Sequence, residues 1–348
     1  MRAAVPVTLR ETMIVGSPPA RRTVSLPYRL IGLLADGRFH SGEALGAAVG
    51  MSRAGVWKSL RRLDEFGLVV CAVRGRGYRL AEPLELLREE EIRAALGPEG
   101  VARLARLEIH PVLDSTNRHL QDRARAGAPS GCACLAEMQR HGRGRHGRDW
   151  VSPFAANIYL SLLWRFAGGP AALKGLSLAA GVAGAAALAD LGITGMGLKW
   201  PNDLVWNGRK LAGILIDLAG ESAGPCYVVV GMGVNVAMPA AAGTAIDQPW
   251  VDLATMTGSR ISRNRLAGHL LRHLVLALER FAAGGFAPFA SQWRRLDVTA
   301  GRRVDLQLPD RTVSGVAEGV DSEGALLLRV EGRRRRFAAG ELHLRVRA

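Results

Sequence analysis

The part of the chain best equipped for chemistry is a short run of glycines and arginines at residues 142–148, with the sequence Gly-Arg-Gly-Arg-His-Gly-Arg. Glycine lets the backbone approach a ligand closely and take positive φ angles at little cost. Arginine carries a planar set of donors that matches phosphate or carboxylate groups. The run therefore predicts a flexible loop that clamps an anionic group, for which a phosphate is the best fit.

The same glycines satisfy the pattern G-x-G-x-x-G of dinucleotide-binding turns, but their context does not. A helix should follow that turn, whereas residues 150–154 (Trp-Val-Ser-Pro-Phe) lead into an apolar strand candidate. Arginines also occupy positions where a Rossmann turn keeps its backbone close to the pyrophosphate. We therefore expect no Rossmann site. A solvated basic surface loop remains the alternative if the run acts alone.

Two further motifs accompany this loop. Residues 114–117 (Asp-Ser-Thr-Asn) have the side chains that begin a helix, where free N–H groups can also meet a polar ligand. Helix capping alone is the competing interpretation. Residues 199–203 (Lys-Trp-Pro-Asn-Asp) place a proline after a short strand, so Lys199 can point from the strand end into a cleft. A compact ammonium there suits an acyl-phosphate or a carboxylate, although a lone lysine is more often solvated.

The elements that must position these motifs begin with a small unit at residues 27–82. Ser41 and Ser52 can each cap a helix, and Gly50 and Gly67 can each end one, which predicts three short helices, the third over 53–66. Strand-like residues 68–73, a glycine-arginine turn and a returning strand follow. This order predicts a winged helix-turn-helix domain.

The charge of this small unit favours DNA as its partner. Residues 27–80 hold nine basic against four acidic side chains, a suitable footprint for phosphates. A role limited to protein contacts is the alternative. The predicted DNA-binding residues lie around the third helix and in the wing: Ser52, Arg53, Trp57, Lys58, Arg61, Arg74 and Arg76.

The rest of the chain is expected to complete an α+β multidomain protein. Residues 83–100 predict a charged linker helix, and residues 101–296 a mixed α/β domain with apolar strands and two long helices, near 173–191 and 263–281. Residues 297–348 alternate apolar residues with turns and predict a small SH3-like β-barrel. Residues 1–26 are expected to form a disordered leader that carries no secretory signal.

The net charge, the cysteines and the apolar runs of the chain indicate its partners and its location. The net charge of +15, from 46 Lys+Arg against 31 Asp+Glu, favours phosphate-bearing partners. A coding bias toward arginine explains much of the excess equally well. Four scattered cysteines show no metal-binding spacing and fit a reducing cytoplasm. The apolar run 175–189 is shorter than the roughly 20 residues of a membrane span, so we expect a buried helix and no membrane contact.

Together these motifs resemble those of the bifunctional biotin–protein ligase and biotin operon repressor family. Residues 210–215 (Lys-Leu-Ala-Gly-Ile-Leu) and 231–235 (Gly-Met-Gly-Val-Asn) add to the likeness, which extends from about residue 26 to residue 345. The resemblance implies a ligase domain with three groups of site residues. Catalytic residues would be Lys199, Arg143 and Arg145. Biotin would be bound by Ser115, Thr116, Asn117, Gln139, Arg143, Gly144, Arg145 and Lys199. ATP would be bound by Asn235, Trp250 and Arg148, and Arg345 would also lie near the nucleotide.

The resemblance also implies a reaction and its partners. Biotin and ATP, with Mg²⁺, would give biotinyl-5′-AMP, and biotin would pass to a lysine of the apo biotin carboxyl carrier protein of acetyl-CoA carboxylase. The adenylate-bound form would be a homodimer that represses the biotin operon at its operator DNA, in the cytoplasm. Three alternatives stay open at this point: a sensing repressor without ligase activity, a monofunctional ligase, and a lipoate ligase.

Overall fold

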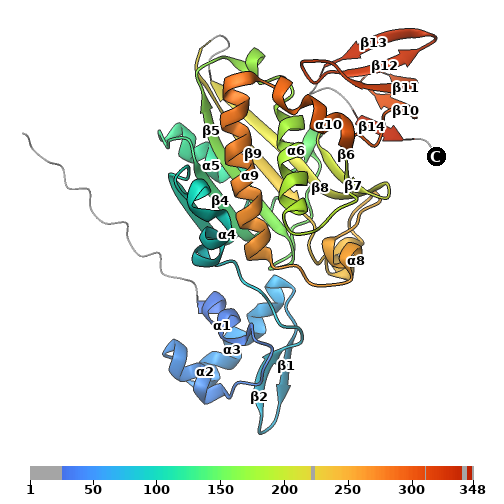
Figure 1. Cartoon of the computed structure of the whole chain (residues 1–348). Coiled ribbons are helices and arrows are strands. Elements are labelled where there is room, and N and C mark those ends of the chain that lie inside the picture. The colour runs from blue at the N-terminus through green and yellow to red at the C-terminus, as the bar shows by residue number, and fades with distance from the viewer. Residues whose placement is uncertain (1–25, 221–223, 310, 339–342, 347–348) are drawn as a thin grey trace, which may run out of the picture.

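The fold is known from a computed structural model that describes residues 26–220, 224–309, 311–338 and 343–346. A winged helix-turn-helix unit at one end, a large mixed α/β domain and a small β-sheet domain at the other end follow one another along the chain (Figure 1). The overall class expected from the sequence is therefore confirmed. The leader expected over residues 1–26 lies outside the described residues, except that Leu26 begins the first helix.

The N-terminal unit is built as its capping residues predict. Ser41 Oγ accepts a hydrogen bond from Ala44 N at 3.0 Å, and Ser52 Oγ accepts one from Gly55 N at 3.2 Å. Gly50 ends the second helix in the left-handed region, with φ 73°. The elements are α1 (Leu26–Leu34), α2 (Gly42–Val49), α3 (Arg53–Leu60), the 3₁₀ helix η1 (Arg61–Phe66), β1 (Val70–Val73) and β2 (Gly77–Leu80).

Two helices differ from the expectation. The predicted helix over 53–66 is α-helical only to Leu60 and continues as the tighter η1, which still buries Leu63 completely. The predicted linker helix over 83–100 begins only at Glu89, as α4 (Glu89–Val101). Its first part is extended because the backbone N–H groups of Leu87 and Arg88 bond to side chains of the α/β domain instead of forming a helical turn.

The α/β domain is organised on a seven-stranded sheet with the order β3-β4-β5-β9-β8-β7-β6. The pair β3 and β4 is parallel, and the other pairs are antiparallel. The strands are β3 (Arg106–Leu113), β4 (Cys132–Gln139), β5 (Ile158–Phe166), β6 (Gly197–Lys199), β7 (Asp203–Trp206), β8 (Arg209–Gly220) and β9 (Cys226–Val234).

The two faces of this sheet have different coverings. One face buries alternate residues such as Leu135 and Leu162 against the main core, which includes residues of α6 (Leu176–Ala189) and α9 (Arg263–Gly284), and α4 packs on α9 (Figure 1). The other face buries the intervening residues, such as Cys134 and Leu163, against α5 (Thr116–Arg125). Short helices complete the connections: η2 (Arg145–Gly147), η3 (Pro170–Leu173), α7 (Ala240–Gly243), α8 (Leu253–Thr257), η4 (Ala287–Phe289) and α10 (Ala290–Leu296).

The C-terminal domain is a five-stranded antiparallel sheet with the order β13-β12-β11-β10-β14. Within the residues that the structure describes, the edge strands β13 and β14 do not pair with each other, so the expected closed barrel is not confirmed. The run of arginines on β13 lies exposed at a sheet edge, as its charge predicts. The strands are β10 (Arg303–Gln307), β11 (Thr312–Val320), β12 (Leu326–Val330), β13 (Arg333–Phe337) and β14 (His343–Val346).

One helical stretch in the described part of the chain, Pro170–Ala189, is long and apolar enough to cross a membrane. It contains α6, which forms part of the main core against the sheet, and 67% of it is buried. Its apolar character is therefore accounted for by packing inside the fold.

Phe154 joins the winged unit to the α/β domain. It follows the glycine-arginine loop in sequence, yet it packs into the core of the winged unit and is only 4% exposed. Its ring lies 5.2 Å from that of Phe66 and 6.3 Å from that of Tyr28, edge-on in both cases. The segment that leaves the loop is thus fixed by apolar contact with the first domain.

We expect Phe154→Ala to lower the free energy of unfolding by roughly 3–5 kcal/mol, because it removes a buried aromatic side chain and leaves a cavity between domains. Urea titration of the full chain, followed by circular dichroism, measures the change. Phe337→Ala, at a half-buried ring of the C-terminal sheet, is the control and should cost less. A loss below about 1 kcal/mol for Phe154→Ala would show that the contact is not tightly packed.

Candidate active site

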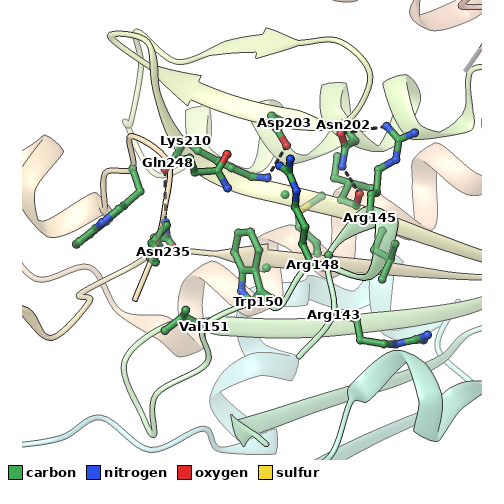
Figure 2. A pocket seen from close by; sticks show the side chains of 18 of the residues that line it. Arg143, Arg145, Arg148, Trp150, Val151, Asn202, Asp203, Lys210, Asn235 and Gln248 are labelled. Carbon is green, nitrogen blue, oxygen red and sulfur yellow. Dashed lines mark hydrogen bonds and ion pairs between the residues drawn. The ribbon is translucent and has the colours of Figure 1, made fainter. Parts of the chain in front are cut away.

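A cavity of about 970 Å³ opens on the face of the sheet that carries α5. Residues of the sheet, of the start of α5 and of the glycine-arginine loop line it, together with a segment near residues 245–250. The three motifs singled out in the sequence, at 114–117, 142–148 and 199–203, therefore lie around one space although they are far apart in the chain. Figure 2 shows part of this lining.

Glycines of β8 and β9 form the floor of the cavity. A Cβ atom at Gly231 would lie 2.2 Å from Asn117 Oδ1, and one at Gly233 would lie 2.5 Å from the ring of Trp150. Such distances are well inside van der Waals contact, so only glycine lets these side chains rest on the strands. The glycines of the motif at 231–235 are thus explained by the close approach of Asn117 and Trp150 to strand β9.

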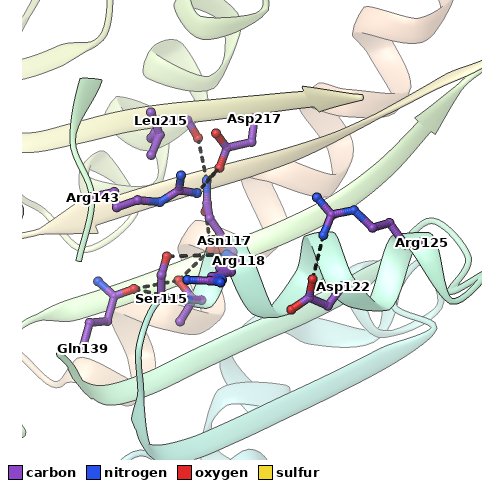
Figure 3. Close-up of polar contacts among 11 residues, drawn as sticks. Ser115, Asn117, Arg118, Asp122, Arg125, Gln139, Arg143, Leu215 and Asp217 are labelled. Atoms are coloured by element: carbon purple, nitrogen blue, oxygen red, sulfur yellow. Dashed lines mark hydrogen bonds and ion pairs between the residues drawn. The ribbon is translucent and has the colours of Figure 1, made fainter. Parts of the chain in front are cut away.

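A hydrogen-bond network fixes the start of α5 over this floor (Figure 3). Ser161 Oγ lies 2.5 Å from Asn117 Oδ1 and 2.7 Å from Thr116 Oγ1. Gln139 Oε1 accepts hydrogen bonds from the backbone and hydroxyl of Thr116, at 2.9 and 3.1 Å. Ser115 is the N-cap of α5 and is 5% exposed. The residues at the start of α5 therefore line the cavity, and Ser115 among them also caps the helix.

The glycine-arginine loop folds over the cavity as a compact turn. Gly144 N bonds to Arg148 O at 2.7 Å, and Trp150 N bonds to Gly142 O at 2.8 Å. Arg143 turns toward the network of α5, where its guanidinium donates to Asp217 at 2.8 Å (Figure 3). Asp217 also accepts from Asn117 Nδ2 at 2.9 Å. Arg143 therefore lies on the α5 side of the cavity.

Arg145 lies on the other side, in a largely desolvated position. Burial lowers the pKa of its guanidinium from the usual value, and the nearby Asp203 opposes that shift only in part. Its hydrogen-bond partner is the neutral amide of Asn202, with Nη1 3.5 Å from Oδ1. Asn202 is itself anchored to Ile214 O at 2.8 Å. An anionic ligand would stabilise the charge of Arg145 more than these groups do.

Two lysines share one carboxylate beside Arg145. Lys199 Nζ lies 3.3 Å from Asp203 Oδ2, and Lys210 Nζ lies 2.9 Å from Asp203 Oδ1. Figure 2 shows Lys210 and Arg148 extending toward Asp203. The ammonium of Lys210 also lies 5.4 Å from the ring centre of Trp150. The strand-end lysine predicted from sequence thus points into the cavity with a second lysine opposite.

The side expected to hold a nucleotide lies beyond Lys210. Asn235 is buried and donates to Val251 O at 3.2 Å. Trp250 lines the cavity, with its ring packed over Gly243, and its backbone bridges to Lys210. Arg345 is on β14, paired in register with Asp305, and its side chain lies outside the described residues.

The residues expected to bind DNA lie around α3 and in the β1–β2 turn of the winged unit, which forms one end of the molecule (Figure 1). All seven are exposed, and Trp57 is 50% exposed. The guanidinium of Arg61 lies 5.1 Å from the ring centre of Trp57, and that of Arg76 lies 4.4 Å from the ring of Phe39. The surface of α3 and the wing therefore presents cations next to aromatic rings.

Sequence reasoning missed several residues of the cavity. Lys210 was recognised only as part of a motif, although its position as a rare lysine among arginines was a usable signal. Ser161 and Asp217, which lie beside the cavity and bond to Asn117, gave no signal, since each stands alone in an apolar strand. Within the lining itself, no role was predicted for Trp150, Asp203 and Arg302.

The fold and cavity define a class: a winged helix-turn-helix unit attached to an α/β domain with a cationic, glycine-floored pocket for an anion. Residues 109–235 match the biotin/lipoate A/B protein ligase family, 299–345 the biotin protein ligase C-terminal domain, and 29–79 an HTH domain.

Comparison with individual proteins identifies the same family. The chain is 44% identical to the bifunctional ligase/repressor BirA of Escherichia coli, over 92% of this chain and 98% of that one. It is 37% identical to the biotin–[acetyl-CoA-carboxylase] ligase of Mycobacterium tuberculosis, over 77% and 98%. The biotin protein ligase of Aquifex aeolicus, solved with biotin and ATP, superposes with a TM-score of 0.61 at 26% identity, covering 70% of this chain and all of that one. The chain belongs to the biotin protein ligase family.

We expect Gly231→Ala to displace Asn117 from Ser161 and Asp217 and to lower the free energy of unfolding by roughly 1–3 kcal/mol through overpacking. Gly144→Ala is the matched control, because its Cβ would meet nothing closer than 3.4 Å and its φ is −100°. Thermal denaturation of both variants makes the comparison. Equal stability of the two would contradict the close approach at Gly231.

Proposed function

We propose that this chain is an ATP-dependent biotin–protein ligase that also acts as a biotin-responsive repressor of the biotin operon. It forms biotinyl-5′-AMP and transfers biotin to a lysine of the biotin carboxyl carrier protein of acetyl-CoA carboxylase. The full-length likeness to a bifunctional ligase/repressor supports both roles. The charge of the cavity is the structural observation that carries the ligase role.

The cavity lining contains six cationic side chains against three carboxylates. An adenylate with its phosphate, and before it ATP, supplies the negative charge that such a pocket needs. The cations are Arg143, Arg145, Arg148, Lys199, Lys210 and Arg302, and the carboxylates are Asp149, Asp203 and Asp247. A pocket for a neutral ligand would have no reason to keep this imbalance.

We assign biotin to the α5 side of the cavity. The polar groups of Thr116, Asn117 and Gln139 are connected there through hydrogen bonds, and Ser115 caps the same helix beside them. This arrangement suits a ligand with a polar ring head. Gly144 and Arg143 belong to the loop that covers this side. The biotin carboxylate then extends toward Lys199 and Arg145.

In the first step the biotin carboxylate attacks the α-phosphorus of ATP, and pyrophosphate leaves. Lys199 and Arg145 stabilise the charge that develops on the phosphoryl oxygens, and Arg143 holds the loop over biotin. The loop excludes water, which would otherwise hydrolyse the mixed anhydride. The glycines of the loop allow it to follow the ligand.

ATP lies on the side of Asn235, Trp250 and Arg148, where the ring of Trp250 offers a surface for adenine. Mg²⁺ is usually held by phosphates with only one or two carboxylates. Asp203, which lines the cavity beside Lys199 and Lys210, would hold the ion together with the nucleotide. The ion would neutralise charge at the phosphate oxygens.

In the second step the lysine amine of the carrier protein attacks the acyl carbon of the adenylate and AMP leaves. This step needs no nucleophile from the ligase itself. It needs an open path from the surface to the anhydride.

We expect Lys199→Ala and Arg145→Ala each to slow biotin transfer by roughly 10²–10³-fold, because each removes a donor aimed at developing charge. The measurement incubates the purified chain with biotin, ATP-Mg²⁺ and an apo carrier domain, and follows the carrier by mass spectrometry. Lys174→Ala, at an exposed lysine paired with Glu323, should transfer at the normal rate.

The same assay separates the alternative functions. An unmodified carrier, with the protein folded and biotin bound, would contradict ligase activity and favour a repressor that only senses biotin. A carrier that gains lipoate instead of biotin would identify a lipoate ligase.

We assign the repressor role to the winged unit, residues 27–82, with the linker at 83–100, the ligase domain at 101–296 and the C-terminal domain at 297–348. For the C-terminal domain we propose an SH3-like barrel. The support is its succession of short antiparallel strands, although β13 and β14 do not pair within the described residues. Ordering of the loop by the adenylate favours a homodimer, whose paired winged units fit a two-fold operator. The four free thiols fit a cytoplasmic location.

We expect Arg61→Ala to weaken operator binding by about 1–3 kcal/mol, because it removes an exposed cation beside Trp57 on α3. Arg62→Ala is the matched control, since Arg62 already pairs with Glu65 at 3.1 Å. Gel shifts use a duplex selected from a random library, with and without biotin and ATP. Equal losses of operator affinity in Arg61→Ala and Arg62→Ala would contradict the role of Arg61. Equal losses, or operator binding that does not change when biotin and ATP are added, would favour a monofunctional ligase.

A further inference from the structure

A second cluster of chemically active side chains lies on the α5 face of the sheet, outside the cavity lining. It consists of His110 on β3, His119 on α5 and Cys134 on β4. A ligand atom of each lies within 4.8 Å of those of the other two. His110 and Cys134 are buried and His119 is half-buried. We propose that these three side chains bind a transition-metal cation of the Zn²⁺ type.

The three residues come together because of the sheet register. Cys134 pairs with Glu108 of the parallel strand β3, and His110 lies two residues beyond Glu108, so all three side chains point to one face. His119 faces them from the first turns of α5. Residues from three elements therefore meet at one point, which no spacing in the sequence reveals.

Glu108 orients both imidazoles. Its Oε2 lies 3.2 Å from His110 Nε2 and 2.8 Å from His119 Nε2. The carboxylate of Glu108 can thus accept a hydrogen bond from each Nε2–H.

That arrangement decides which nitrogen can bind a metal. A neutral imidazole that donates through Nε2 carries its lone pair on Nδ1. A carboxylate that accepts from the other ring nitrogen is the usual partner of a metal-bound histidine. Two imidazole nitrogens and one thiolate form a donor set that suits Zn²⁺ or Co²⁺ and not Mg²⁺ or Ca²⁺.

Metal binding requires the three donor atoms to move closer together. Tetrahedral Zn²⁺ with nitrogen and sulfur ligands holds its donor atoms about 3.3–3.6 Å apart, against the upper limit of 4.8 Å here. Rotation of the half-buried His119 supplies this adjustment. Three protein ligands leave a fourth position for water. The thiolate and Glu108 balance the charge of the ion, while Arg106 and Arg123 reach Glu108 from the solvent side.

A bound ion would tie the start of α5 to the sheet. His119 lies in the turn that follows Thr116 and Asn117, and Cys134 pairs across the sheet with Ser161, which bonds to both of them. The ion would thus add a fixed point next to that network. This inference does not depend on the function proposed above.

The test uses the full chain after treatment with a chelator, and Co²⁺ as the probe. We expect one equivalent to bind, with a thiolate-to-cobalt absorption band in the near ultraviolet and the visible spectrum of a tetrahedral ion, and Zn²⁺ should displace it. Cys134→Ser and His119→Ala should abolish the band. Cys132→Ser, on the same strand and face but outside the cluster, should keep it.

Two further measurements guard against variants that fail to fold. Glu108→Gln keeps an acceptor but no charge and should weaken Co²⁺ binding by roughly 10- to 100-fold. Zn²⁺ should raise the melting temperature of the unmodified chain and not that of His119→Ala. The absence of a thiolate band in the unmodified chain, or a band that survives in Cys134→Ser, would overturn the proposal and leave the cluster an ion-pair network.

Discussion

The active site depends on holding more positive than negative charge in a partly enclosed space. Asp203 pairs with two lysines at once, and the half-buried guanidinium of Arg145 has the neutral amide of Asn202 as a hydrogen-bond partner, at 3.5 Å. Charges in such a position are costly unless they are paired. The carboxylates of the lining therefore do not balance its cations, and a ligand that carries phosphate would do so. The proposed binding of an adenylate rests on this imbalance.

The central sheet separates the source of stability from the charged site, because its two faces have different coverings. One face packs α6 and α9 into a continuous apolar core, which supplies the stability. The other face is freed for chemistry by glycines at 213, 231 and 233, over which Asn117 and Trp150 rest. The loop between them is attached at its far end by Phe154, which sits in the core of the winged unit. Ligand binding at the loop and the position of the DNA-binding unit therefore share a short stretch of chain.

Much of this could be read from the sequence, because local chemistry decides it. Ser41, Ser52 and Ser115 cap helices where their types predict, and the three motifs of the ligase domain meet around one cavity. The extended start of the linker could not be predicted, since it depends on bonds from Glu137 and Asn264, which are distant in sequence. Asp217 and Ser161 were missed for the same reason. Their roles arise from strand register, which composition does not encode.

The most direct test of the charge argument is a crystal structure of the chain with biotinyl-5′-AMP. We expect the phosphate to lie within hydrogen-bond distance of Arg145 and Lys199, with the loop of residues 142–148 closed over it and biotin beside Asn117. A phosphate that contacts neither cation, with Arg145 still directed at Asn202, would contradict it.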